Sequence, residues 1–210
     1  DHGRAKPACW KWYAVDWDGN VWCYRELYVN RCDAGHEGDN RWEVDEIGAK
    51  VAEWTPKDEI INYCVADPSI FSKIGLAESV GERLQRAVGD RIHIIPAKLI
   101  SLGGRGARIS GWDIMHQYLA WSPSKPSRLH YFSTCYNSIR TIPSLIHDEK
   151  NPEDLDTEGE DHAADPDRYF LQTLRNMKSE APRSLAEQMI RKQQEQDSTF
   201  NINEFYHGYQ

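Results

Sequence analysis

The chain has 210 residues, a formal net charge of −8 and five cysteines. This length suits one domain with a sizeable core, and a hydrophobic content of 40%, with eight Trp and ten Tyr, excludes wholesale disorder. No apolar run reaches the roughly 18 residues that a membrane span needs, and the polar, tryptophan-rich residues 1–20 predict no signal peptide. The cysteines form no CxxC pair, which favours reduced thiols in a cytoplasm-like compartment over a structural zinc site.

The first predicted element is a hairpin. Two segments rich in aromatic and branched residues, ACWKWYAV (8–15) and VWCYRELYV (21–29), flank the turn signal Asp18-Gly19. Such a pattern predicts two antiparallel strands that are neighbours in one sheet.

Strands and helices alternate after the hairpin. Apolar spacing predicts a helix over 40–54, with Asp39 or Asn40 as its N-cap. The other predicted elements are strands at 60–66, 91–97 and 128–134, and helices at 78–88, 110–121, 136–146, 166–177 and 183–196. The alternation predicts an α/β fold, a mixed sheet flanked by helices. We expect residues 1–177 to form the domain and 178–210 a C-terminal helix and tail.

The charge is unevenly distributed along these elements. Residues 147–167 hold ten Asp or Glu and one Lys, a net charge of −9, so the rest of the chain carries about +1. Residues 98–140 hold six Lys or Arg and one Asp, a net charge of +5. This polarisation suits a basic nucleic-acid-binding surface beside an acidic site, although two solvated surfaces would give the same pattern.

One candidate site residue is Asp67, which follows the predicted strand 60–66 and precedes Pro68. A carboxylate at the carboxyl end of a buried strand lies where α/β sheets commonly bind ligands. The alternative is an ordinary Asx-Pro turn with a structural role only.

The acidic stretch EGEDHAADPDRYF (158–170) holds three more candidates, Asp161, His162 and Asp165. In a helix, spacings of three and four residues would put each pair on one face, where the pair could hold a cation. Alternatively, Asp165 caps a helix that begins at Pro166, and the stretch is a solvated acidic loop.

The glycine-rich stretch LGGRGARISG (102–111) lacks the Lys-Ser/Thr pair of a nucleotide-binding phosphate loop. We interpret it as a flexible hairpin that brings Arg105 and Arg108 to a phosphodiester backbone, or as an ordinary surface loop. No arrangement of serine, cysteine and histidine indicates a nucleophilic triad.

Four stretches together resemble a known family. They are DHGRAKP (1–7), VADPSIF (65–71), RISGWD (108–113), and FSTCYNSIRTIPSL (132–145) with DEKNPEDLDTEGEDHAADPDRY (148–169). In this order they resemble the nuclease domain of the large terminase subunit of tailed bacteriophages, over roughly residues 1–175.

The resemblance implies a ribonuclease-H-like fold and an endonuclease that cuts concatemeric viral double-stranded DNA during genome packaging. Two divalent ions, Mg²⁺ or Mn²⁺, would be its cofactors. The catalytic acids would be Asp1, Asp67 and Asp161, with Asp1 bridging both ions and the other two binding one each. Asp165 and His162 would be further metal ligands.

The resemblance also implies partners and a location. Double-stranded DNA, the terminase ATPase domain, the small terminase subunit and the capsid portal would be partners, in the host bacterial cytoplasm and without a membrane. The expected sequence-independent DNA contacts are Lys98, Arg105, Arg108 and Arg128. Two alternatives are a Holliday-junction resolvase-like or transposase-like nuclease, and a non-catalytic module that docks DNA or the portal.

Overall fold

The computed structural model describes residues 7–29, 42–73, 75, 77–100, 104–156 and 159–180. The chain divides into two compact units, Asp1–Asn176 and Met177–Gln210, and every described strand belongs to the first. The predicted helix at 183–196 lies outside the described residues.

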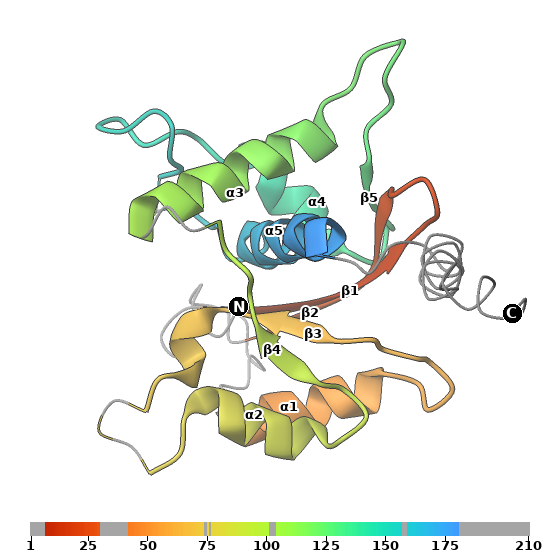
Figure 1. Ribbon diagram of the computed structural model, residues 1–210, viewed down its shortest axis with the longest axis vertical. Helices are drawn as coiled ribbons and strands as arrows, with labels where there is room; N and C mark the ends of the chain where they lie inside the picture. Colours follow the sequence, from red (N-terminus) through yellow and green to blue (C-terminus); the bar gives the residue numbers. More distant parts are fainter. Residues whose placement is uncertain are drawn as a thin grey trace, which may run out of the picture. The chain divides into compact units, whose positions relative to one another are not determined.

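A three-stranded mixed sheet contains the predicted hairpin. Strands β1 (Ala8–Val15) and β2 (Val21–Val29) pair antiparallel, and β5 (Leu129–Tyr131) pairs parallel with β2 (Figure 1). The hairpin turn is held by Asp16, whose backbone carbonyl accepts from the N–H of Gly19 at 3.0 Å. Gly19 has a φ of 80°, which glycine adopts without steric cost. The predicted hairpin and the mixed sheet are thus confirmed.

A second, two-stranded sheet lies apart from the first in the described chain. Strands β3 (Cys64–Ala66) and β4 (Ile94–Pro96) pair parallel, and both are shorter than predicted. Helices α1 (Val44–Trp54) and α2 (Val80–Val88) cover these strands, and the five strands form two sheets rather than one.

Local hydrogen bonds fix the start of α1. Its N-cap is Glu43, whose side chain accepts from the third helical N–H while Glu46 bonds back to the N–H of Glu43 at 2.7 Å. The prediction of Asp39 or Asn40 as cap is therefore wrong, because this reciprocal pair starts the helix at Val44.

Helix α3 (Gly104–Leu119) begins earlier than predicted. The expected glycine hairpin is helical from Gly104 onward, and Ser110, the first residue of the predicted helix, lies inside α3. The added first turns are held by packing, because Ala107 is buried and Arg108 pairs with Asp154 and Asp161. Further along, Gly111 lets α3 approach α5 (Ala164–Glu180) closely. A Cβ added at Gly111 would overlap the side chains of Arg168 and Gln172.

The last two described helices differ in length from the prediction: α4 (Tyr136–Thr141) is shorter, and α5 (Ala164–Glu180) is longer. Helix α4 continues as a 3₁₀ turn, Ile142–Ser144, which contains Pro143. Helix α5 begins at Ala164, so Asp165 is its second residue and is not its N-cap. Pro166 is tolerated in this first turn because the first N–H groups of a helix have no intrahelical partner.

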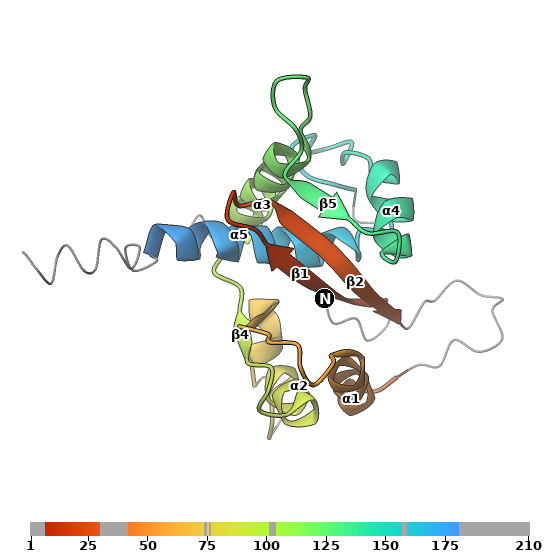
Figure 2. The same ribbon diagram turned by 90° about the vertical axis from the view of Figure 1, so that its right-hand side faces the viewer.

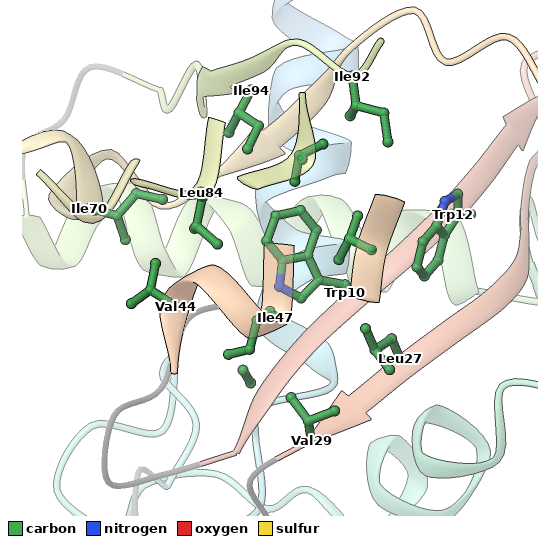
Figure 3. Close-up of a cluster of buried hydrophobic side chains, with 13 residues drawn as sticks. Trp10, Trp12, Leu27, Val29, Val44, Ile47, Ile70, Leu84, Ile92 and Ile94 are labelled. Atoms are coloured by element: carbon green, nitrogen blue, oxygen red, sulfur yellow. The ribbon is translucent and has the colours of Figure 1, made fainter. Parts of the chain in front are cut away.

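Successive side chains of β1 point to opposite faces of the sheet, and each face contributes to one of two hydrophobic clusters. Trp10 and Trp12 point toward α1 and α2 and join Ile47 and Leu84 in one apolar cluster (Figure 3). Side chains of the opposite parity meet α5, where the ring of Tyr13 stacks on Phe170 with centroids 4.2 Å apart. Strand β1 is therefore covered by α1 and α2 on one face and by α5 on the other (Figure 2). Within the described residues, no helix has the length and apolar character to cross a membrane.

Candidate functional site

Asp67 lies at the carboxyl end of β3 and caps the 3₁₀ helix Pro68–Phe71. One carboxylate oxygen accepts from the backbone N–H of Ser69 at 2.7 Å, and the other accepts from the hydroxyl of Tyr169 at 2.5 Å. The predicted Asx-Pro turn is thus present, and it aims the carboxylate at α5.

The electrostatic setting favours the ionised form of Asp67. Burial raises the pKa of this carboxyl. The hydrogen bonds from Tyr169 and Ser69 and the nearby charge of Arg168 together lower the pKa by more than burial raises it. The net pKa lies below the ordinary value of 3.8. Asp67 is therefore a partly exposed carboxylate at neutral pH, as a cation ligand must be.

Asp165 lies on the same side of α5 as Tyr169 and is joined to it through Arg168. The Nε and Nη2 atoms of Arg168 donate to one oxygen of Asp165, Oδ1, at 3.0 and 2.7 Å. The guanidinium stacks over the ring of Tyr169 at 4.3 Å and over that of Trp112 at 5.0 Å. Since Tyr169 also binds Asp67, two adjacent side chains connect Asp67 to Asp165.

Asp161 lies just before α5 and has a different partner. Its Oδ2 is 3.3 Å from Nη2 of Arg108, and its Oδ1 is 3.5 Å from Nδ1 of His162. The Nε of Arg108 also lies 2.9 Å from Asp154, so one arginine of α3 bridges two acids. His162 and Asp161 are both buried, at 8% and 6% exposure.

Protein cations thus neutralise much of the acidic stretch. Arg140 binds Glu160 through two hydrogen bonds of 2.7 and 2.6 Å, as Arg168 binds Asp165 and Arg108 binds Asp161. The alternative of a solvated acidic loop is therefore wrong for Glu160, Asp161 and Asp165, since each carboxylate has a basic side chain beside it.

Asp167 of α5 is a further acidic residue, which the sequence did not single out as a site residue. Asp167 forms an ion pair of 2.6 Å with Lys11 of β1, and both side chains are fully excluded from solvent. Tyr13 and Tyr131 also donate to Asp167, at 2.7 and 2.8 Å. A lysine between Trp10 and Trp12 in an otherwise apolar strand was the signal that could have indicated a buried charged partner.

The four basic residues predicted to contact DNA differ in their exposure and in their partners. The side chain of Lys98 is exposed, whereas Arg108 is engaged by Asp154 and Asp161. Arg128 donates to the carbonyl of Gly19 at 2.9 Å and stacks over Tyr118. The side chain of Arg105 lies outside the described residues.

The predicted metal ligands are only partly brought together. Asp67 is linked to Asp165 through Tyr169 and Arg168, and Asp161 lies with His162 beside Arg108. Asp1 lies outside the described residues. In the described ranges, no group of three or more His, Cys, Asp or Glu side chains is placed to hold a metal ion.

Comparisons of this chain with family models, with curated proteins and with solved structures found no match. The site's contacts and the sequence motifs therefore carry the functional argument. Chemically, Asp67 and Asp165 offer hard oxygen ligands at the junction of a strand end and a helix start.

Proposed function

We propose that this chain is a metal-dependent endonuclease with a ribonuclease-H-like fold, which cuts viral double-stranded DNA during genome packaging. The observation that carries the proposal is the link from Asp67 through Tyr169 and Arg168 to Asp165. It unites the acid at the end of β3 with the first turn of α5, two of the four stretches that resemble terminase nucleases.

The donor set fits divalent cations of the Mg²⁺ type. Both hydrogen bonds from Arg168 go to Oδ1 of Asp165, and within the described residues no hydrogen bond reaches Oδ2. Asp67 is held by two neutral donors and stays ionised. Carboxylates suit Mg²⁺ and Mn²⁺ because these ions prefer hard oxygen ligands.

Five residues would hold the cations: Asp67, Asp161, Asp165, His162 and Asp1. Bound divalent ions would supply an activated water and stabilise the charge on the leaving 3′ oxygen of the phosphodiester. Tyr169 would fix the orientation of Asp67, and Arg168 that of Asp165. The positive charge of Arg168 also limits how many cations the acids retain without DNA phosphate nearby.

Lys98 would contact the DNA backbone, because its side chain is exposed at the end of β4. A contact with phosphate makes binding sensitive to salt and independent of sequence. Arg108 would act indirectly, since it holds Asp161 in place. The ATPase domain, the small terminase subunit and the portal remain proposed partners.

The test is cleavage of supercoiled plasmid with Mg²⁺, Mn²⁺ or EDTA, by the native chain and by Asp67→Asn, Asp161→Ala and Asp165→Asn. Asp90→Asn, a change at an exposed turn residue, is the matched control. We expect metal-dependent linearisation by the native chain and the control, and a loss of at least about 100-fold in the site variants. Undiminished cleavage by Asp67→Asn would overturn the assignment of this site.

A non-catalytic module that docks DNA or the portal is the second candidate. The pairing of Asp165 with Arg168 and of Asp161 with Arg108 favours it, because these acids already have structural partners. Plasmid that is bound but never cut, with equal binding in EDTA and Mn²⁺, would support this candidate instead of the nuclease.

A further inference from the structure

Two thiols that are far apart in the chain meet where α4 packs against β2. Cys23 of β2 and Cys135, which precedes α4, are 112 positions apart, yet their sulfur atoms are separated by only 3.5 Å. Both side chains are fully buried, and both are thiols in this structure. The separation is about 1.5 Å longer than the S–S bond of a disulfide.

Hydrogen bonds on both sides of Cys135 keep the two sulfur atoms close. Before Cys135, the backbone N–H of Phe132 donates to the carbonyl of Cys23 at 2.9 Å. After it, the carboxylate of Glu26 in β2 accepts from the backbone N–H of Ser138, in the first turn of α4, at 2.9 Å. The thiol of Cys135 also donates to the carbonyl of Cys23 at 3.3 Å. The fold therefore holds the pair at a separation that side-chain rotation can close.

The electrostatic setting makes Cys135 the more acidic thiol of the pair. The hydrogen bond from Cys23 lowers the pKa of Cys135 below the ordinary value of 9.0, although burial raises it. The contact with Cys135 and burial together raise the pKa of Cys23. The positive charge of Lys11 favours the thiolate of both. Because a thiolate attacks oxidants and a thiol does not, Cys135 is the nucleophile of the pair.

Cys9 and Cys64 differ from Cys135 in acidity. Burial raises the pKa of each of these two thiols to about 12. A thiol with such a pKa holds almost no thiolate at neutral pH, so it is oxidised slowly. An oxidant that enters the folded protein should therefore react at Cys135 before it reacts at either of them.

Cys135 lies just below the surface of the molecule. Residues 132–134 and Tyr136 are exposed, although Cys135 between them is buried. A small oxidant such as hydrogen peroxide can reach the sulfur when this segment opens locally, without unfolding of the core.

We propose that Cys23 and Cys135 form a peroxide-sensitive pair, whose oxidation to a disulfide joins β2 covalently to the start of α4. The thiolate of Cys135 attacks one oxygen of hydrogen peroxide, so that an S–O bond forms, the O–O bond breaks and hydroxide leaves. This hydroxide takes up the proton that Cys135 released. The thiol of Cys23 then attacks the sulfur of the resulting sulfenic acid, and an S–S bond forms as water leaves with the proton of Cys23.

The reaction is balanced and reversible. Two thiols lose two electrons and two protons, and one hydrogen peroxide is reduced to two waters. A dithiol reductant returns the disulfide to two thiols by exchange. The disulfide closes the chain between residues 23 and 135 into a loop, which restricts the unfolded chain and stabilises the folded state.

The test exposes the full chain at pH 7 to a small excess of hydrogen peroxide and maps its cysteines by mass spectrometry of non-reduced peptides. Cys23→Ala and Cys135→Ala each remove one thiol of the pair, and Cys64→Ala is the matched control. A parallel set contains dimedone, which traps sulfenic acid. Thermal unfolding before and after treatment with dithiothreitol measures the effect of the disulfide on Tm.

We expect the native chain and Cys64→Ala to give one pair of peptides joined through Cys23 and Cys135. Their Tm should rise by at least about 5 °C and return to the starting value with dithiothreitol. Cys23→Ala should leave Cys135 as a sulfenic acid that dimedone traps. Cys135→Ala should leave Cys23 reduced, because the nucleophile is gone.

A pair that stays reduced in the folded native chain, or that is joined only after unfolding in urea, would overturn the proposal. Oxidation of Cys9 or Cys64 as fast as Cys135 would overturn it too, as would a linkage through Cys32, which lies outside the described residues. An unchanged Tm of the linked protein would contradict the stabilising role. The native chain alone gives these outcomes, so they do not depend on the folding of a variant or on nuclease activity.

Discussion

The hydroxyl of Tyr169 donates a hydrogen bond of 2.5 Å to Asp67, which lies 102 residues earlier in the chain. This bond ties the first half of α5 to the carboxyl end of β3. It also puts Asp67 within the electrostatic reach of Arg168, the residue before Tyr169, which binds Asp165. The proposed site depends on this junction.

Tyr169→Phe tests the junction. The folded-state pKa of Asp67 is lowered, so Asp67 contributes stability above the unfolded pKa of about 3.8, and this contribution is lost as pH falls through the folded pKa. Removing the Tyr169 hydroxyl should cost about 1 kcal/mol near pH 7, and less as the pH falls below the unfolded pKa of about 3.8 and through the lower folded pKa of Asp67. Urea denaturation at several pH values measures this. A cost that is independent of pH would contradict the role given to Asp67.

The buried ion pair of Lys11 and Asp167 predicts a non-additive mutant cycle. Lys11→Met should cost about 3–5 kcal/mol, because it leaves the Asp167 carboxylate buried without its cation. The double variant with Asp167→Asn should be less destabilised than the sum of the single variants, since the neutral amide oxygen still accepts from Tyr13 or Tyr131. Urea denaturation of the four proteins gives the coupling energy, and additive costs would argue against a charge interaction.

Gly111→Ala tests the close approach of α3 and α5. The added methyl would overlap Arg168 and Gln172, so the two helices must separate or Arg168 must move. We expect a loss of about 1–3 kcal/mol in the free energy of unfolding, typical of overpacking. Gly159→Ala is the control, because its nearest neighbour lies 3.4 Å from the added Cβ. Equal stability of both variants would mean that Gly111 does not set the helix spacing.

Lys98 and Arg108 should separate DNA binding from folding. Lys98→Gln should weaken DNA binding and reduce the salt slope of log K by about 0.9, because one phosphate contact is lost. Arg108→Gln should lower Tm instead, since it leaves Asp154 and Asp161 without their shared cation. Fluorescence anisotropy across a salt series and thermal unfolding measure the two effects. A lower Tm for Lys98→Gln would show that its role is structural.

Local signals in the sequence predicted the elements that depend on local interactions. The turn Asp18-Gly19 and the alternation around Trp10 and Trp12 were sufficient for the hairpin, because turn chemistry and strand periodicity act over neighbouring residues. The start of α3 could not be predicted in this way. Its glycines suggested a loop, whereas the burial of Ala107 and the ion pairs of Arg108 with Asp154 and Asp161 are long-range contacts that hold these residues in the helix.

The sequence indicated the acidic residues of the candidate site, but not all of the basic side chains that bind them. Asp67 was indicated by its place after a predicted buried strand; it does follow β3, although this strand is only half-buried. The ion pair of Asp161 with Arg108 joins α3 to the segment before α5, and no spacing rule within one segment predicts it. The pair of Asp165 with Arg168 is local, since the two residues are three apart in α5. The ligand roles of Asp1, Asp161, His162 and Asp165 stay predictions.

The most direct test of the central claim is a Mn²⁺ titration followed by electron paramagnetic resonance. The claim is that Asp67 and Asp165 serve one cation site. The native chain and Asp90→Asn should remove free Mn²⁺ signal with equal affinity. Asp67→Asn and Asp165→Asn should each weaken binding by at least about tenfold, at a temperature where thermal unfolding shows that both variants are folded. Native Mn²⁺ affinity in both site variants, or no binding by the native chain, would contradict the claim.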